Sequence, residues 1–504
     1  MTTAKRPLQG IATLITVRRK APVPLYQQIY DAYRRSIARG NLRVGELVPS
    51  SRELARELRV SRLPVLNAYA QLLAEGYFES RTGAGTFIAA SFPGRTGAPE
   101  ARAKVDATSG ARPIAARASA LTRCERPSSA ESLGPFQVGQ PALKDFPIDI
   151  WAKLVGRSSR RMRVRGLQYG NPMGLKELRV TIASYLRKAR AVRCEAEQIM
   201  IVSGSQQALD LSARVLLDPG TPVWVEEPGY WLMHQVVKAA DCRAVPVPVD
   251  AEGLNVAAGI KLCPKARAAF VAPSHQYPLG VTMSATRRFE LLDWAEKAGS
   301  WIVEDDYDSE FRYDSMPIAS LQGLDTNSRV IYVGTFSKVL FPSLRLGYLV
   351  IPPDLVERFS AVRQATDLCP SHGNQAVLAE FIREGHFSRH IRKMRQLYSD
   401  RRRVLVEEIE RELGDCCEIL GGEAGMHLTV SIGERLRDTE IAAKAVQRKL
   451  WLSPLSPSYV GSSPRQGFVL GFGNTSAAEI PAAVRLLRVS MKGTALPRKD
   501  IHSL

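Results

Sequence analysis

The sequence predicts an α/β protein in two unequal parts, a small helical head followed by a large body with a mostly parallel sheet. Three observations support this fold class. At 504 residues the chain exceeds what one hydrophobic core usually holds. From Phe136 onward, short apolar runs alternate with helical stretches, the pattern of strands and crossover helices. Between the parts, residues 91–130 are rich in Ala, Gly, Pro, Ser and Arg, which is typical of a flexible linker.

The charge of the chain is unevenly distributed. Residues 1–130 carry 21 Lys and Arg against 9 Asp and Glu, a net +12 of the total +19. A basic head favours a nucleic-acid partner, although a solvated basic surface would give the same count. No apolar run is long enough to cross a bilayer, so we expect a cytoplasmic protein. The seven cysteines form no C-x-x-C pair, which argues against a metal site.

The head begins with three predicted helices. Apolar residues recur every four positions over 25–37, and Gly40 ends this first helix. The stretch VPSSRELARELRV predicts a second helix with Ser50 as N-cap and Glu53 at the capping-box position. After a short break, an apolar stripe predicts a third helix over about 61–75. Two helices joined by so short a turn are typical of a helix-turn-helix.

The next segment, YFESRTGAGTFI, predicts two short strands around a Gly-rich turn, the wing of a winged helix. Together, PLYQQI, PSSRELA, VSR, AYAQLLAEGY and GAGTFI resemble the GntR-type winged-helix DNA-binding domain over residues 22–90. The resemblance implies DNA contacts from the starts of the second and third helices and from the wing. These residues are Ser51, Arg52, Ser61, Arg62, Arg81, Gly83 and Gly85.

The chemistry of these positions agrees with the resemblance. Hydroxyls and amides at helix N-termini bind phosphates, and arginine can form two hydrogen bonds to guanine. The segment SRLPV departs from the family pattern, because Leu63 and Pro64 stand where members more often carry threonine. Pro64 is tolerated in a first helical turn. We therefore expect a head that binds DNA with an unusual base preference.

The body, residues 131–504, contains chemically active residues directly after predicted strands. The strands are residues 199–202, 221–227, 268–273, 300–306, 329–335 and 346–352. Gly204 and Ser205 follow one strand and open a helix, Asp305 and Tyr307 lie at the end of another, and Lys338 follows a third. In sheets of this class, ligands bind outside the carboxyl ends of the strands.

Each of these features alone has an ordinary explanation, since most loop lysines are solvated and a Gly-Ser pair is often only a helix cap. Together they supply what a pyridoxal phosphate (PLP) site requires. Lys338 offers the amine for an imine (Schiff base), Asp305 a carboxylate for the pyridine nitrogen, and Tyr307 a donor to the ring hydroxyl. The predicted phosphate partners are Gly204, Ser205, Gln206, Thr335, Ser337 and Arg345.

The order and spacing of these motifs resemble the class I aminotransferases of fold type I, whose PLP-dependent transferase fold adds a smaller C-terminal α+β subdomain. Residues 167–186 resemble the family's small-ligand loop, and the family role of Tyr169 implies a phosphate contact in the partner subunit. EEPGY offers Tyr230 as a face for the cofactor ring. VAPSHQYPLG carries Tyr277 where aminotransferases have an asparagine, and it adds His275 to the candidate site.

A winged-helix head, a basic linker and an aminotransferase-like body resemble the MocR-type transcription regulators, the GabR-like branch of the GntR superfamily. PSHQYPLGVTMS, EDDYDSEFRY, GTFSKVLFPSLRLGYLV and HIRKMRQLY carry this resemblance along nearly the whole chain. It implies a head-to-tail homodimer that binds promoter DNA. It also implies that PLP, or its adduct with an amino acid or amine effector, modulates that binding. We expect a regulator with at most a residual aminotransferase half-reaction.

Two other hypotheses remain open at this point. An active aminotransferase with an appended head would hold its substrate carboxylate with a late arginine. GFVLGFGN contains none, which leaves Arg465 as the nearby effector candidate, with Arg395 as a further pocket candidate. Leu232 stands where GABA-responsive regulators carry a second arginine, which argues against a GABA-like effector. A cofactor-free scaffold is disfavoured because every cofactor position holds a suitable residue.

Overall fold

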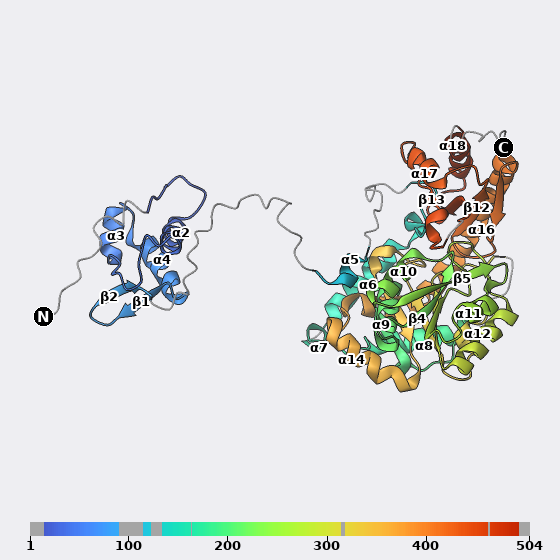
Figure 1. The fold of residues 1–504 in the computed structure, drawn as a ribbon, viewed down its shortest axis with the longest axis horizontal. Coiled ribbons are helices and arrows are strands. Elements are labelled where there is room, and N and C mark those ends of the chain that lie inside the picture. The colour runs from blue at the N-terminus through green and yellow to red at the C-terminus, as the bar shows by residue number, and fades with distance from the viewer. Residues whose placement is uncertain are drawn as a thin grey trace, which may run out of the picture. The chain divides into compact units, whose positions relative to one another are not determined.

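The computed structural model describes residues 15–89, 114–121, 134–162, 164–313, 318–461 and 464–492. The chain divides into two compact units, Met1–Pro113 and Ile114–Leu504, and Figure 1 shows the elements of each. Of the predicted linker, residues 91–113 and 122–130 lie outside the described ranges, so that prediction stays untested. Within these ranges no helix is long and apolar enough to cross a membrane.

The first unit is a winged helix, as predicted. Its elements are α2 (Leu25–Ala38), α3 (Ser51–Glu57), α4 (Arg62–Ala74), β1 (Phe78–Arg81) and β2 (Gly85–Ile88). The two strands pair antiparallel, with Phe78 opposite Ile88. The predicted capping box is confirmed, because the Ser50 hydroxyl accepts from the Glu53 amide at 3.3 Å while the Glu53 carboxylate accepts from the Ser50 amide at 2.9 Å.

Three aromatic rings hold the elements of the head together. Tyr33 on α2, Tyr69 on α4 and Phe78 on β1 meet edge to face, with ring centroids 5.1 to 5.8 Å apart. The buried Tyr33 and Tyr69 hydroxyls lie 3.0 Å apart, and the Tyr69 hydroxyl donates to the Pro49 carbonyl at 2.9 Å. These bonds satisfy two polar groups inside an otherwise apolar core, so the angle between the two helices is well defined.

The second unit is built on an eight-stranded sheet in the order β3-β10-β9-β8-β7-β4-β5-β6. The strands are β3 (Ile199–Val202), β4 (Pro222–Glu227), β5 (Arg243–Asp250), β6 (Gly253–Leu254), β7 (Ala268–Val271), β8 (Trp301–Asp306), β9 (Val330–Thr335) and β10 (Gly347–Val350). Strands β5, β4, β7, β8 and β9 pair in parallel, whereas β10 is antiparallel to both of its neighbours and β6 to β5. The predicted mostly parallel sheet is confirmed.

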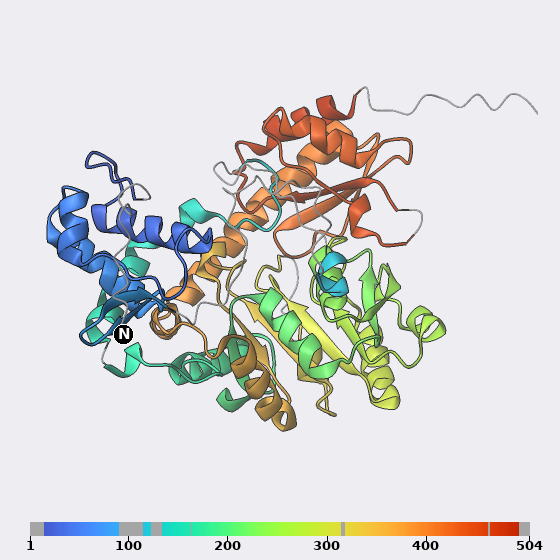
Figure 2. The same ribbon diagram turned by 60° about the vertical axis from the view of Figure 1, so that its left-hand side comes forward.

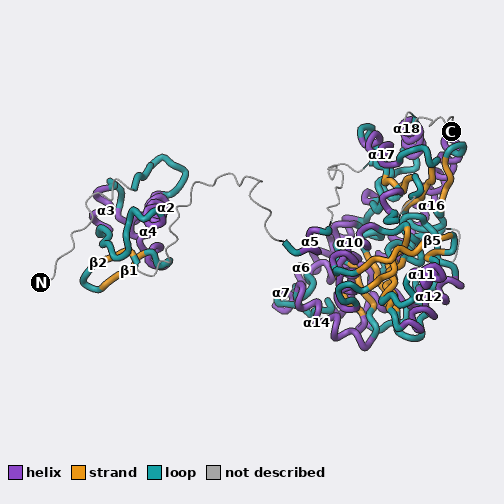
Figure 3. Tube along the Cα trace, viewed as in Figure 1, coloured by secondary structure: helices purple, strands orange, loops and turns teal. Residues whose placement is uncertain are grey.

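Helices lie around this sheet, as the purple tubes around the orange strands of Figure 3 show. They are α5 (Ala116–Ser119), α6 (Ile148–Arg161), α7 (Val164–Leu167), α8 (Lys176–Ala189), α9 (Ser205–Leu216), α10 (Trp231–Ala239), α11 (Val256–Leu262), α12 (Ala285–Ala298), α13 (Leu321–Leu324), α14 (Val356–Asp367) and α15 (Gly373–Arg383). Successive strand residues pack into different cores: Val303 of β8 lies in the cluster with Leu209 of α9, and Ile302 in the cluster with Trp294 of α12. Burial on both faces explains why the strands are apolar throughout.

A smaller antiparallel sheet forms the predicted C-terminal subdomain, drawn in orange and red in Figure 2. Its strands are β11 (Cys417–Leu420), β12 (His427–Ile432), β13 (Ser453–Pro454) and β14 (Gly467–Gly471), in the order β11-β12-β14-β13. Its helices are α16 (His386–Leu413), α17 (Asp438–Val446) and α18 (Ile480–Met491). Short 3-10 turns, at Leu143–Asp145, Ala196–Gln198, Pro342–Leu344, Pro353–Leu355 and Ser456–Ser458, complete the second unit.

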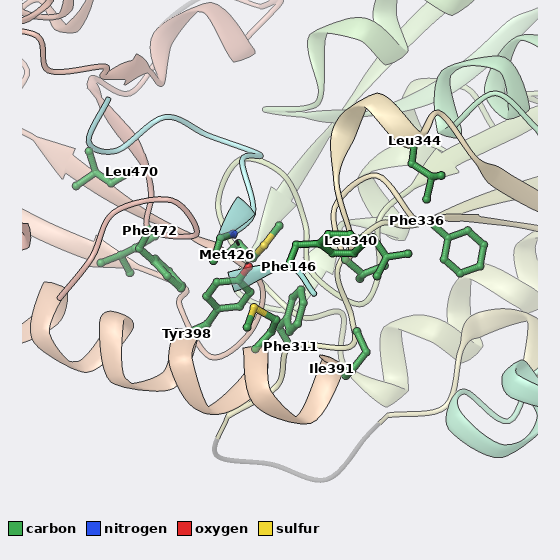
Figure 4. Close-up of a cluster of buried hydrophobic side chains, with 14 of the residues drawn as sticks. Phe146, Phe311, Phe336, Leu340, Leu344, Ile391, Tyr398, Met426, Leu470 and Phe472 are labelled. Atoms are coloured by element: carbon green, nitrogen blue, oxygen red, sulfur yellow. Dashed lines mark hydrogen bonds between the residues drawn. The ribbon is translucent and has the colours of Figure 1, made fainter. Parts of the chain in front are cut away.

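One buried cluster joins the segment after β9 to the C-terminal subdomain. Figure 4 shows Phe336 and Leu340 together with Tyr398 of α16 and Phe472, which follows β14. Lys338 lies between the first two of these side chains in the sequence. The backbone that carries the lysine is therefore anchored on both sides by side chains that cannot move without opening the core.

Candidate functional site

The topology of the sheet brings residues from distant parts of the sequence to one edge. Gly204 follows β3, Asp305 is the last residue but one of β8, and Lys338 follows β9. Because β10 is antiparallel to β3 and β9, those two strands point the same way and β10 begins where they end. Arg345, just before β10, therefore lies at the same edge.

The polar groups at one end of this edge form an anion-binding cradle. Gly204 has φ +91 as N-cap of α9, and a Cβ built on it would lie 3.2 Å from Arg345 Nη1. The Arg345 guanidinium donates to the Ser203 carbonyl at 2.5 Å. The Thr335 hydroxyl accepts from the Ser337 amide at 3.2 Å. The Ser337 hydroxyl is buried and has no hydrogen-bond partner among the described residues.

The first turn of α9 completes the cradle. Ser205 and Gln206 begin the helix, where backbone N–H groups have no intrahelical acceptor and the helix dipole attracts an anion. The Gln206 side chain donates to the Leu232 carbonyl of α10 at 3.4 Å, which ties the cradle to the next helix. A phosphate group fits this set, since it would accept from the free amides and the Ser337 hydroxyl and pair with Arg345.

A buried carboxylate and the candidate lysine lie next to the cradle. Asp305 is 6% exposed, and its Oδ1 has no hydrogen-bond partner in the described part of the chain. Burial, reinforced by the neighbouring Asp306, raises the pKa of Asp305 to about 7, and the positive charge of Lys338 opposes this rise. The Lys338 amine donates to the Gly139 carbonyl at 3.2 Å. A side chain at Gly139 would displace that amine, since a Cβ there would lie 2.3 Å from Nζ.

The two adjacent acids at the end of β8 have different surroundings. Asp306 forms a buried ion pair with Arg190 at 2.8 Å and accepts from the Tyr332 hydroxyl at 2.6 Å. Arg190 also donates to the Ile318 carbonyl and the Ser274 hydroxyl, each at 2.7 Å. Asp306 makes these bonds through Oδ2, and its Oδ1, like the Oδ1 of Asp305, has no hydrogen-bond partner among the described residues. The two acids differ in that Asp306 is paired with Arg190, whereas the charge that acts on Asp305 is that of Lys338.

A hydrogen-bonded group lies beside the predicted ring-hydroxyl donor. The Tyr307 hydroxyl is 3.2 Å from His275 Nδ1, which is 2.9 Å from Asp308 Oδ1. The ring of His427 lies 4.5 Å from that of His275, and burial lowers the pKa of His427 well below its usual value, with His275 and Lys338 adding to the effect. Gly425 is required here, since a Cβ on it would lie 2.0 Å from the His275 ring.

The same residues extend into a continuous aromatic wall. Tyr277 is 5.4 Å from His427 and 5.6 Å from Tyr230 between ring centroids. The predicted Tyr230, His275 and Tyr307 thus belong to one wall. His275, Asp308 and His427 offer ligand atoms within 4.8 Å of one another, so the expectation of no metal stays a prediction.

Sequence reasoning missed several of these residues. Asp308 stands one position after Tyr307 in the motif EDDYDSEF, where a second carboxylate was a usable signal. His427 on β12 and Gly139 gave no signal, because the fold brings them to the site from far along the chain.

Three predicted residues do not join the site within this chain. Tyr169 is 84% exposed, so only its predicted role in a partner subunit remains. Arg465 is exposed; the nearby Val460 and Gly461 amides donate to the Glu227 carboxylate at the end of β4. The Arg395 guanidinium donates two hydrogen bonds to a main-chain carbonyl, that of Glu310, which supports a structural role.

In the head, the predicted DNA contacts lie at two helix N-termini. Ser51 and Arg52 start α3, and Ser61 is the N-cap of α4, which begins at Arg62. The guanidinium of Arg62 donates to the Ser51 hydroxyl at 3.1 Å, so the two helix starts are adjacent. Both arginines are exposed.

The wing presents its predicted residues differently. Arg81 donates to the Glu79 carboxylate at 2.5 Å and lies 4.8 Å above the Phe87 ring, so its charge is already paired. Gly83 and Gly85 have φ +77 and +111, values that few other residues adopt. They permit the tight turn between β1 and β2. The individual DNA contacts stay predictions.

Comparison with known proteins finds separate family matches for the head and for the body. Residues 137–484 match the family described as aminotransferase class I and II, and residues 25–88 match the bacterial regulatory proteins of the gntR family. The chain is 39% identical to the probable rhizopine catabolism regulatory protein MocR of Rhizobium meliloti over 475 residues, 94% of this chain and 95% of that protein. The chain belongs to the MocR-type regulators.

Other matches agree with membership of the MocR-type family. The chain is 30% identical to the HTH-type pyridoxine biosynthesis transcriptional regulator PdxR of Corynebacterium glutamicum, over 90% of this chain and 93% of that one. The body resembles the kynurenine aminotransferase of Pyrococcus horikoshii with a TM-score of 0.69 and 29% identity, over 75% of this chain and 96% of that one. The predicted resemblance and the predicted fold class are confirmed.

Proposed function

We propose that this MocR-type chain is a DNA-binding transcription regulator whose body binds PLP, and that PLP or its adduct with an amine modulates promoter binding. The observation that carries the proposal is the unpartnered oxygen of Asp305, buried beside Lys338 and next to an anion cradle, in a chain with a GntR-type head. The proposed head spans residues 22–90, the linker 91–130 and the body 131–504.

Each residue of the site has a defined part in this proposal. Lys338 would hold the carbonyl carbon of PLP, and Asp305 would keep a proton on the ring nitrogen. Tyr307 would donate to the ring hydroxyl, with Tyr230 against the ring face. Thr335, Ser337, Arg345 and the first turn of α9 would bind the phosphate. When bound, PLP supplies an electrophilic carbon to which an amine effector adds reversibly.

The surroundings of the site favour binding and response over turnover. Strand β14 carries Gly467, Phe468, Val469, Leu470 and Gly471, and none of these can hold a substrate carboxylate by two hydrogen bonds. We propose Arg465, on the loop before that strand, as the effector's partner. The proposed effector then has an arginine partner on a loop, and no arginine on the strand itself holds a substrate carboxylate for turnover.

We also propose a head-to-tail homodimer that completes the site. Large apolar side chains are exposed around α6 and α7, with Met162 at 38%, Leu167 at 76% and Tyr169 at 84%. A second copy of the chain would cover them and receive the Tyr169 hydroxyl at its phosphate cradle. Because the proposed partner is promoter DNA, we also propose a cytoplasmic location.

The test is the visible absorbance of the full chain after addition of PLP, compared with Lys338→Ala and with Lys444→Ala, an exposed lysine of α17. We expect the band of lysine-bound PLP in the wild type and in Lys444→Ala, and its loss in Lys338→Ala. Promoter-fragment binding should then change when PLP and an amine are added to the wild type or to Lys444→Ala, and should not change when they are added to Lys338→Ala. If the wild type shows no such band, the proposal is wrong and the body is a cofactor-free scaffold.

A further inference from the structure

The outward face of α4 carries exposed leucines near its start. Leu63 is 65% exposed and Leu66 is 40% exposed, one turn apart. The opposite face of the helix is buried in the head core through Val65, Ala68 and Leu72. The helix is therefore apolar on both sides at its N-terminal end, although a single core needs only one apolar side.

Neither α2 nor α3 exposes a leucine. The outward positions of α3 are charged, with Arg52, Glu53, Arg56 and Glu57 exposed. On α2, the exposed residues include Arg34 and Arg35. Helix propensity does not explain the leucines, because lysine, arginine and glutamate are nearly as good helix formers and would be soluble there. Among the described helix residues of the head, Tyr26 on α2 is also exposed, at 37%, but the exposed leucines all lie on α4, and two of the three lie beside Arg62.

These leucines lie at the start of the second helix of the helix-turn-helix. In a helix-turn-helix, the first residues of the second helix lie against base edges in the major groove. Leu63 directly follows Arg62, whose guanidinium lies beside the start of α3. Pro64 lacks an N–H and occupies the first turn, so residues 63 and 64 offer no polar side chain to a base. The apolar group that bases present in this groove is the C5-methyl group of thymine.

We propose that Leu63 and Leu66 contact thymine methyl groups, and that the operator of this regulator carries thymines beside the base that Arg62 reads. This inference rests on the proposed DNA-binding function of the head. It assigns base specificity to apolar contact at the positions where polar side chains would otherwise form hydrogen bonds. The operator should therefore be recognised by methyl groups as well as by the guanidinium.

The experiment compares thymine with uracil, which keeps every hydrogen-bonding group and lacks only the methyl. Duplexes selected by the full chain from a random library are resynthesised with thymidine or with deoxyuridine. Burial of one methyl group is worth about a fourfold change in a binding constant, so we expect uracil duplexes to bind the wild type about 4- to 16-fold more weakly.

Variants of α4 assign this effect to particular side chains. Leu63→Ser should weaken binding to thymine duplexes and bring the thymine-to-uracil ratio closer to one, since the methyl then has no apolar partner. Leu73→Ser is the matched control, because Leu73 is 36% exposed at the other end of the same helix. Its ratio should equal that of the wild type. Such a double-mutant comparison isolates the leucine–methyl contact from any general effect of uracil on the duplex.

The outcomes separate this inference from the function on which it rests. Equal wild-type affinity for thymine and uracil duplexes overturns the methyl contact and leaves DNA binding intact. Failure to select any duplex overturns both. If Leu63→Ser changes the sedimentation of the protein while the thymine-to-uracil ratio stays the same, the leucines contact protein instead, and the inference is wrong.

Discussion

The head and the body differ in where they keep their charges. In the head, Arg52 and Arg62 are exposed, and hydrogen bonds lower the pKa values of Glu53 and Glu75. In the body, Glu226, Glu304 and Asp305 are buried, and burial raises their pKa values to about 8, 7 and 7. The head therefore presents its charges to an external charged partner, whereas the body holds charged groups in its interior.

Domain size explains this contrast. A small domain has one thin core and cannot offset the desolvation of buried charges. Among the described head residues, Ser36 is the only buried polar side chain apart from tyrosines. The body has a large sheet with cores on both faces, and it surrounds pairs such as Arg190 and Asp306 with further partners. Four predictions test this contrast, in order of expected effect.

The largest effect should come from Arg190→Met in the body. Removal of one partner leaves the Asp306 charge buried without compensation, and we expect a loss of about 3–5 kcal/mol in the free energy of unfolding. Urea unfolding followed by tryptophan fluorescence measures this in the body alone, since all six tryptophans lie at or after Trp151.

The matched control is Arg214→Met, which breaks an exposed i,i+4 pair with Asp210. Such pairs contribute about 0.3–0.5 kcal/mol. If both arginine variants lose the same stability, the contrast between internal and external charge is wrong.

The next effect is a pH dependence caused by Glu226. The raised pKa, about 8 against an ordinary 4.5, means that the unfolded chain releases this proton at lower pH than the folded chain does. Stability therefore falls as pH rises, with a contribution from Glu226 of about 1.4 kcal/mol per pH unit between roughly pH 5 and 8. Glu226→Gln should remove the part of the slope that Glu226 contributes, while Glu304 and Asp305 keep theirs, so the advantage of the variant over the wild type in urea should grow with pH. Glu197→Gln, at an exposed position, should leave the slope unchanged.

A smaller effect is expected for Arg62→Ala in the head. Loss of an arginine that reads a base should weaken DNA binding by about 1–3 kcal/mol, roughly 5- to 150-fold. Fluorescence anisotropy of a selected duplex measures it, with Arg35→Ala on α2 as the exposed control. The PLP absorbance band should be identical in both variants. A shifted band would show that Arg62 in the head affects the PLP site in the body. That result would contradict the separation of DNA binding and cofactor binding between the two units.

The smallest effect should come from the caps. Ser50→Ala removes the capping box of α3 and should cost the head about 1 kcal/mol, without changing tryptophan fluorescence. Ser284→Ala removes the N-cap of α12, which carries Trp294, and should cost a similar amount that fluorescence does detect. A fluorescence change with the first variant would mean that head and body unfold together.

The sequence predicted more of the fold than of the site. Six strands were located because burial on both faces makes them continuous apolar runs. Strand β5 was not, because Pro246 and Pro248 interrupt its pattern. At the site, motif residues such as Lys338 were identified locally. His427 and Gly139 were not, because their place beside the lysine depends on packing between distant segments.

Helix α16 has a mechanical consequence. It runs for 28 residues without glycine or proline, so it is a stiff rod about 42 Å long. Near one end, the His390 ring donates to the Val339 carbonyl at 3.1 Å, directly beside Lys338. The other end, at Leu413, is buried in the C-terminal subdomain. The helix is therefore a rigid connection about 35 Å long, from His390 to Leu413, between the backbone beside Lys338 and the C-terminal subdomain.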